Sequence, residues 1–349
     1  MIDGRAAVVT VVGLLGCVAG LILAPRDAFA AWLVCWLAWG AIPIGALAGT
    51  MMLALVPGSW RDLYARPLAA ATALLPLTAL LALPLLIGVR LLYPWANPAI
   101  GSTLPTFKAF WLSIPVFVVR EIIVLTALSG LAWGILTTNG ITRSAIAGGG
   151  LLIYALFASI VGIDFAESTE PHFHSSIYGL LALTSQWLAA VSFGILFGLG
   201  GKDRAPFAAA GLLATAILLW AYMHAMQYIV IWSGDIPEEA HWYIERGVGA
   251  WRAIGWVGFA LQAILPFVAL LSPAVRNNAG RMRAVAAIIL IAAPLQQAWM
   301  ILPGLERVGW ATLPLILASS MAMLGLSWLA AGRLQDRLAI NRRFALTAQ

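Results

Sequence analysis

The sequence has very few charged residues. Asp, Glu, Lys and Arg together make up 10% of the 349 residues, whereas a soluble globular domain has about 25%. Hydrophobic residues make up 62%, and this composition excludes a water-soluble fold. Because roughly 20 apolar residues cross a bilayer, the length allows about a dozen crossings at most. We therefore expect one polytopic, all-α membrane domain over residues 1–349.

Residues that bind metals or act as nucleophiles are also scarce. The two cysteines, Cys17 and Cys35, both lie in apolar stretches, and the sequence has no C-x-x-C pair, zinc box or iron–sulfur ligand set. A phosphate loop, an H-E-x-x-H helix and a G-x-S-x-G elbow are absent as well. We expect no catalytic residue, metal or cofactor in this chain, and no enzyme activity of the chain alone. The basic residues are scattered between apolar segments, so a nucleic-acid site is not expected.

The apolar runs predict ten transmembrane helices. Their approximate ranges are 6–24, 29–56, 67–88, 109–136, 145–163, 176–199, 207–232, 250–272, 282–302 and 310–331. The first run is longer than the core of a signal peptide, which favours an uncleaved anchor. Prolines inside the runs predict kinks that neighbouring helices tolerate; they are Pro43, Pro76, Pro115, Pro266, Pro294 and Pro314.

The basic residues predict the orientation in the membrane. Of the 20 Lys and Arg residues, six fall in loops on one side, and Arg120 falls inside a helix. The other thirteen lie on the opposite side: Arg5, Arg61, Arg66, Arg143, Lys202, Arg204, Arg276, Arg281, Arg283, Arg333, Arg337, Arg342 and Arg343. The positive-inside rule places this side, with both termini, in the cytoplasm. The acidic residues show the opposite bias and gather in two outer loops, 164–175 and 233–249.

Two adjacent charges fall inside the predicted fourth span. Arg120 and Glu121 lie about a dozen residues after its start at residue 109, near mid-membrane by the rise of a helix. Buried charges of this kind face the interior of a bundle and mark ion or proton routes. The alternative is that both residues are structural ties to another helix or to backbone carbonyls.

Further polar residues extend this candidate proton path. Histidine titrates near neutrality, and the first outer loop holds Asp164, His172 and His174. In the seventh span, His224 and Tyr228 share a helix face. The candidate path is Arg120, Glu121, Asp164, His172, His224 and Tyr228. Solvated loop residues, a metal site at His172 and His174, and bonds between helices are the alternatives.

The outer loops are also candidates for contact with partner subunits. The residues expected to face a partner are Glu167, Glu170, His174, Asp235, Glu238 and Glu239. Their acidic character makes the predicted outer face the chemically distinctive one.

Several segments together resemble one family. They are Trp60-Arg61, Leu74–Leu77, Leu92–Ala96, Lys108–Pro115 with Arg120, Asp164–Gly179 with Glu170-Pro171-His172, and Gly234–Glu239. In this order they are similar to the ActF subunit of bacterial alternative complex III, an NrfD-like membrane subunit of a quinol:electron-acceptor oxidoreductase. The similarity covers roughly residues 30 to 310.

The resemblance implies a fold and a place in a complex. It implies two four-helix bundles, made of spans two to five and six to nine, with outer helices beside them. It also implies a bacterial inner-membrane complex whose partner subunits carry haem c and iron–sulfur clusters, with quinol nearby. The chain is then expected to be a non-cofactor subunit of a quinol:cytochrome c-type oxidoreductase, with a proton path as a candidate role. An ion-coupled secondary transporter and a purely structural membrane anchor are the alternatives.

Overall fold

The computed structural model describes residues 2–200, 207–305, 309 and 311–337. Within these ranges it contains no strand, and ten helices are long and apolar enough to cross a membrane. The chain is therefore an all-α, multi-pass integral membrane protein, and the expected number of spans is confirmed. Five of the basic residues used to predict the topology, and the first residue of the last predicted span, lie outside the described ranges; they are Lys202, Arg204, Arg307, Arg342, Arg343 and Trp310.

Six of the ten spans are single helices, the fifth and the ninth each end in a short 3-10 turn, and two are interrupted. The helices that form spans one, two, four to seven, nine and ten are α1 (Ile2–Leu23), α2 (Pro25–Leu55), α9 (Ile114–Thr137), α10 (Gly140–Phe165), α11 (Tyr178–Gly198), α12 (Phe207–Gly234), α17 (Ala279–Ile301) and α18 (Thr312–Arg337). The third span consists of α3 (Arg61–Thr72), α4 (Leu75–Leu81) and α5 (Leu83–Ile87). The eighth consists of α14 (Gly249–Phe259), the π-helix η3 (Ala260–Ile264) and α15 (Leu265–Leu271).

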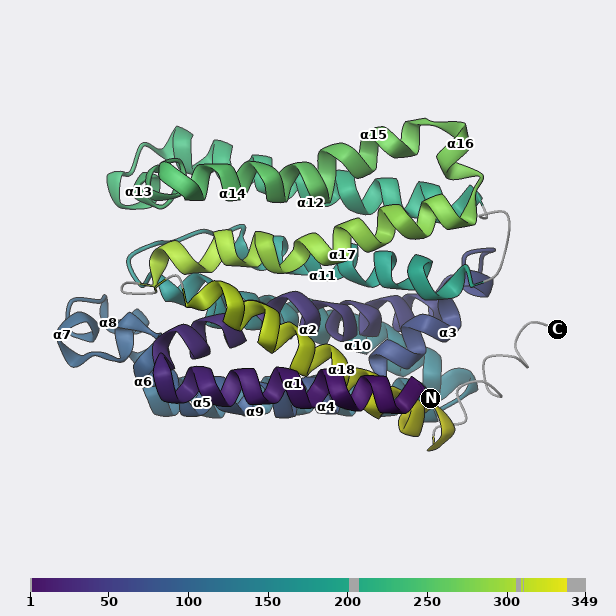
Figure 1. The fold of residues 1–349 in the computed structure, drawn as a ribbon, viewed down its shortest axis with the longest axis horizontal. Helices are drawn as coiled ribbons and strands as arrows, with labels where there is room; N and C mark the ends of the chain where they lie inside the picture. Colours follow the sequence, from purple (N-terminus) through teal and green to yellow (C-terminus); the bar gives the residue numbers. More distant parts are fainter. Residues whose placement is uncertain (1, 201–206, 306–308, 310, 338–349) are drawn as a thin grey trace.

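Short helices lie in the connections. They are α6 (Val89–Leu92), η1 (Pro94–Ala96), α7 (Pro98–Gly101), α8 (Thr106–Trp111), η2 (Glu167–Thr169), α13 (Pro237–Arg246), α16 (Pro273–Arg276) and η4 (Leu302–Gly304). Most of them gather at one end of the molecule, at the left in Figure 1. We call this the loop end; it carries residues 88–113, 166–177 and 235–248. The first residues of α1 and the last of α18 lie at the opposite end (Figure 1).

The long helices form two four-helix bundles. The first bundle consists of α2, the third span, α9 and α10, and the second of α11, α12, the eighth span and α17. They join where α11 packs on α2, α3 and α10, and where α17 packs on α2. The helices α1 and α18 pair with each other and pack against α2 (Figure 1). This is the expected arrangement of spans two to five and six to nine with outer helices beside them.

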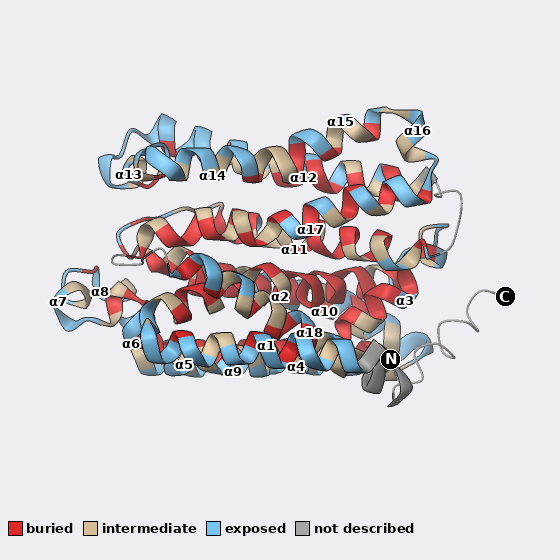
Figure 2. Cartoon of the chain, in the orientation of Figure 1, coloured by how far each residue is buried: buried red, intermediate tan, exposed pale blue. Residues whose placement is uncertain are grey.

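The centre of the protein is α2. In its most apolar stretch 83% of the residues are buried, against 22% in α1 and in α18, and Figure 2 shows the contrast between the central and the peripheral helices. Small residues allow this close packing, because a Cβ added to Gly45 would run into the backbone carbonyl of Gln186 in α11. The exposed apolar side chains of the outer helices are the surface that lipid would cover.

The prolines have more varied effects than the predicted kinks. Pro43 and Pro294 lie inside continuous helices, as expected. Pro76 and Pro115 instead stand in the first turn of a helix that follows a break, because proline is compatible with this position but removes a hydrogen bond further inside. Pro266 follows the π turn, and Pro314 is in the first turn of α18.

The predicted boundaries of the fourth and fifth spans were wrong. The fourth was expected over 109–136, but α8 ends at Trp111 and α9 begins at Ile114, because Pro115 has no N–H to bond the Trp111 carbonyl and is compatible with the first turn of a new helix. The fifth was expected over 145–163, but α10 covers Gly140–Phe165. Arg120 is therefore six residues from the start of the 24-residue helix α9, about 9 Å by the helix rise, and lies about a quarter of the way along the helix instead of near its middle.

Candidate functional site

Arg120 and Asp164 form an ion pair between α9 and the end of α10. Arg120 Nε lies 2.5 Å from Asp164 Oδ2, and the two side chains are 11% and 0% exposed. Trp111 completes the arrangement: its indole N–H donates to Asp164 Oδ1 at 3.0 Å, its carbonyl accepts from Arg120 Nη1 at 3.0 Å, and its ring lies 3.9 Å below the guanidinium carbon. Arg120 is thus tied both to another helix and to a backbone carbonyl, which are the two kinds of partner that the structural alternative named.

Glu121 is fully buried beside this pair. No N–H or O–H donor among the residues that the structure describes reaches either of its carboxyl oxygens, and Arg120 Nη2 has no acceptor; the group close enough to share a hydrogen bond with the Glu121 carboxyl is the Asp164 carboxyl. Asp164 and Arg120 are the charged groups that act on Glu121. Because one guanidinium balances only one carboxylate, and an unpaired buried charge is costly, the charge balance favours a bound proton on the second carboxyl.

Tyr93 closes the cluster from the connection between the third and fourth spans. Its hydroxyl donates to the Phe165 carbonyl at 3.2 Å. Burial raises the pKa of the Tyr93 phenol well above its ordinary value, and the nearby Glu121 and Asp164 carboxyls raise it further. Tyr93 therefore stays a neutral donor next to the two acids.

Aromatic rings surround the cluster and exclude water. The Phe117 ring lies 5.2 to 5.7 Å from the rings of Tyr93, Trp95 and Phe165. Trp95 also donates from its indole to Ser168 Oγ at 3.3 Å, and Ser168 in turn donates to the Asp164 carbonyl. In such a low-dielectric pocket, electrostatic interactions between the charged groups are strong.

The segment from Asp164 to Ile177, which we call the connecting loop, is fixed by further bonds. Lys108 Nζ donates to the Phe173 carbonyl at 3.0 Å, and Glu167 Oε1 accepts from the Ser175 amide at 2.8 Å. Burial lowers the pKa of Lys108, although the Glu167 carboxylate acts in the opposite direction. Ser175 Oγ also donates to Gln227 Oε1 in α12 at 3.2 Å.

A second buried arginine, which the sequence analysis did not single out, holds the other side of the connecting loop. Arg246 at the end of α13 pairs with Glu170 and donates to the backbone carbonyls of Trp242, Trp299 and Met300. Its guanidinium carbon lies 3.7 Å from the Trp242 ring. Burial lowers the pKa of Arg246, and Glu170 opposes this effect. The spacing of Trp242 and Arg246 by four residues on one amphipathic helix was the signal available in the sequence.

The two bundles therefore have matching features at the loop end. In each, an arginine stacks on a tryptophan, donates to the carbonyl of that tryptophan and pairs with a carboxylate of the connecting loop. Asp164 serves the first bundle and Glu170 the second. The Arg120–Asp164 pair thus fixes α9 to the end of α10, where the connecting loop starts, and the Glu170–Arg246 pair fixes the loop to the second bundle.

The six candidate proton-path residues do not form one continuous group. Arg120, Glu121 and Asp164 lie together, whereas His224 packs against Trp220 in the second bundle, with ring centroids 4.2 Å apart. Tyr228 stacks on Trp232 and is 45% exposed. His172 is exposed, and in the described part of the chain no group of three or more His, Cys, Asp or Glu residues comes together to hold a metal ion.

The candidate partner-facing residues fall into two groups, which differ in their exposure. His174, Asp235 and Glu238 are exposed at the loop end, and Glu239 is half-buried. Asp235 has a left-handed backbone with φ of 48°. Burial and the nearby Lys108 lower the pKa of His174. In contrast, Glu167 and Glu170 are half-buried and bonded within the protein, so they support the connecting loop rather than offer a free surface.

No protein-family model matches the chain, and no curated protein matches it. The resemblance to the ActF-like family therefore stays a prediction. What the geometry provides is a water-shielded group of one guanidinium, two carboxyls and a phenol. Such a group can bind and release one proton, and it has no ligand set for a metal in the described ranges.

Proposed function

We propose that this protein is a non-cofactor membrane subunit of a quinol-oxidising respiratory complex, in which the cluster of Arg120, Glu121 and Asp164 binds and releases a proton. One observation carries the proposal. The segments that resemble the ActF-like family are far apart in the sequence, yet Tyr93, Trp95, Lys108, Trp111 and Arg120 all bond to the connecting loop.

The proton resides on Glu121 in the resting cluster. Arg120 and Asp164 neutralise each other, so the neutral acid at Glu121 adds no uncompensated charge. Loss of this proton leaves a second anion beside Asp164, and the unpaired N–H of Arg120 Nη2 is then a donor that turns toward it. The cluster accordingly exchanges a proton with a partner site at the loop end.

The loop end faces the periplasm in this proposal. The predicted positive-inside orientation puts the opposite end in the cytoplasm of a bacterial inner membrane, and the exposed His174, Asp235 and Glu238 then face partner subunits. Those partners carry the haem c and iron–sulfur clusters, and quinol binds nearby. This chain contributes the membrane scaffold and the proton-binding group.

The test is to purify the native assembly through a tag on this chain. The expected result is co-purification of subunits with haem c and iron–sulfur absorption, together with quinol oxidation. Replacement of Glu121 by Gln in the same assembly should change proton release per quinol oxidised while the haem spectrum stays the same. Recovery of the chain alone, in mild detergent and from membranes that contain such complexes, would overturn the proposal.

A further inference from the structure

The second bundle contains a cavity where it faces α2. The cavity has two lobes that share Ala41, Ser185, Gln296 and Gln297. One lobe extends to Gln262 of the π-helix, and the other toward the loop end past His224. Among the lining residues, all of which the structure describes, none is Asp, Glu, Lys or Arg. The cavity is therefore polar but uncharged.

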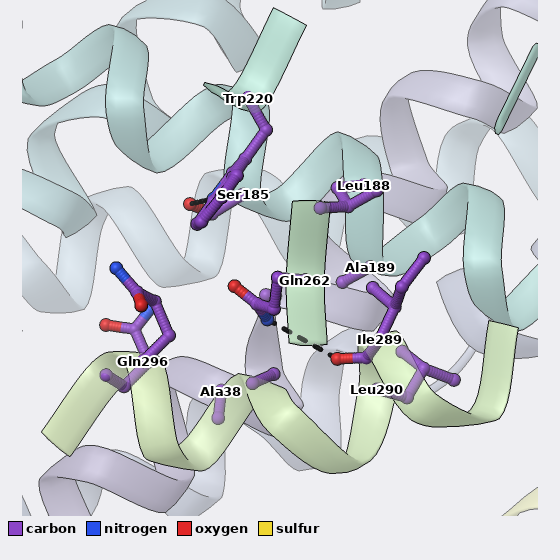
Figure 3. Close-up of a pocket in the computed structure, with 12 residues that line it drawn as sticks. Ala38, Ser185, Leu188, Ala189, Trp220, Gln262, Ile289, Leu290 and Gln296 are labelled. Carbon is purple, nitrogen blue, oxygen red and sulfur yellow. Dashed lines mark hydrogen bonds between the residues drawn. The ribbon is translucent and has the colours of Figure 1, made fainter. Parts of the chain in front are cut away.

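Two amide side chains that line the cavity have unpaired acceptors. Gln262 and Gln296 are each only 5% exposed, and the Oε1 atom of each has no hydrogen-bond partner among the described residues. Figure 3 shows both side chains around the same space as Ser185. Leaving a buried acceptor unpaired costs about 1–3 kcal/mol, so these two oxygens call for a donor inside the cavity.

Two proline residues add backbone hydrogen-bond acceptors to the first lobe, the one that extends to Gln262. A proline has no N–H to bond the carbonyl four residues before it. Pro266 and Pro294 therefore leave the carbonyls of Gln262 and Leu290 without their helical donors, and both of these residues line the first lobe. The π turn at Ala260–Ile264 precedes Pro266 directly, and such turns are frequent at functional sites.

We propose that this cavity binds a small cluster of water molecules that donate hydrogen bonds to Gln262, Gln296 and the freed carbonyls. The cavity volume, counted as the space open to the centre of a water molecule, is about 20 Å³ in the first lobe and about 40 Å³ in the second. One buried water needs about 10–15 Å³ by this measure. The two lobes thus hold a few waters and no larger solute.

The lining also determines that the occupant is neutral. Two carboxamide oxygens and the carbonyls attract donors, but no carboxylate in the lining balances a cation. The Ser185 hydroxyl accepts from the Trp220 indole at 3.1 Å and donates to the Leu181 carbonyl at 2.8 Å, so its second lone pair is the position that can accept a hydrogen bond from a water. His224 lines the second lobe and provides a further polar partner.

The test is X-ray hydroxyl-radical labelling of the full chain in lipid nanodiscs, because radicals formed from bound water oxidise the side chains beside it even when they are buried. Trp220 lines the first lobe and Met300 the second. The matched controls line neither lobe: Trp36 has the same 1% exposure as Trp220, and Met51 is buried at 0% exposure against 6% for Met300. We expect labelling of Trp220 and Met300 at least several-fold faster than that of the controls.

Variants keep the test specific. Gln296→Met removes a carboxamide from the cavity at similar volume and should slow labelling of both Trp220 and Met300. Gln227→Met replaces another buried Gln that does not line the cavity and should leave both rates unchanged. Labelling of Trp220 and Met300 as slow as that of Trp36 and Met51 in the wild type overturns the proposal. So does labelling that changes when sodium replaces choline in the buffer, since the occupant would then be a cation.

Discussion

Replacing Arg120 by Leu should cost stability by leaving Asp164 as an unpaired buried charge. Asp164 is fully buried, and its remaining side-chain donor is the Trp111 indole. Breaking a buried ion pair by removing one partner costs about 3–5 kcal/mol. We expect a fall of several degrees in the melting temperature of the purified protein in detergent, measured by intrinsic tryptophan fluorescence.

The double variant Arg120→Leu with Asp164→Asn separates this charge effect from lost packing. The Asn side chain keeps an acceptor for the Trp111 indole but carries no charge, so the double variant should recover at least half of the lost stability. Asp164→Asn alone should be destabilised, because Arg120 then lacks its counter-ion. A double variant no more stable than Arg120→Leu would refute the assignment of the loss to an unpaired Asp164.

Three further predictions follow from buried or tightly packed positions. Glu121→Gln should leave the melting temperature close to that of the wild type, because a neutral amide replaces a neutral carboxyl and can still donate to Asp164. It should also remove a protonated-carboxyl band from the infrared spectrum, and persistence of that band would show that the proton resides elsewhere. Burial raises the pKa of Glu170, with Arg246 acting against this effect, so the stability from this carboxyl is fully present below its unfolded pKa of about 4.3 and is lost as pH rises through the folded value. The melting temperature of the wild type should therefore fall as pH rises above about 4. Glu170→Gln, although less stable overall, should lack the part of this fall that comes from the Glu170 carboxyl. Parallel pH profiles of the two proteins would show that Glu170 is not the source of the pH dependence. Gly45→Ala should destabilise the protein strongly, because the added Cβ would run into the Gln186 carbonyl. Gly130→Ala in α9 should not, because a Cβ added there has no atom within 4 Å. Equal melting temperatures of the two variants would show that α2 and α11 are not in such close contact.

The spans could be predicted from the sequence because crossing a bilayer imposes a length and a composition. Hydropathy, however, does not register a break between two apolar helices. The predicted fourth span ran through Leu112 and Ser113, and this error placed Arg120 too deep. The proline at position 115 was the signal for a helix start.

The candidate site was predicted only in part. The chemistry of Arg120, Glu121 and Asp164 was visible, because ionisable residues in apolar runs are rare. The role of Arg246 was not, since a charge in a polar segment looks solvated until the fold buries it at 1% exposure. Gln262 and Gln296 were missed for a related reason: a single amide in an apolar run carries no charge, and only the fold shows that they line one cavity.

The connecting loop also limits how the two bundles can move. Asp164, at the end of α10, pairs with Arg120 and so fixes the start of the loop within the first bundle, and Glu170 ties the loop to Arg246 in the second. A protein that exposed a site alternately to the two sides of the membrane would have to rock one bundle against the other. Drawing the second bundle away from the first at the loop end would pull on the Glu170–Arg246 pair, and breaking it in every cycle would cost about 3–5 kcal/mol each time. The two bundles are thus held together at the loop end. This arrangement fits a rigid membrane scaffold better than a transporter whose bundles rock against each other.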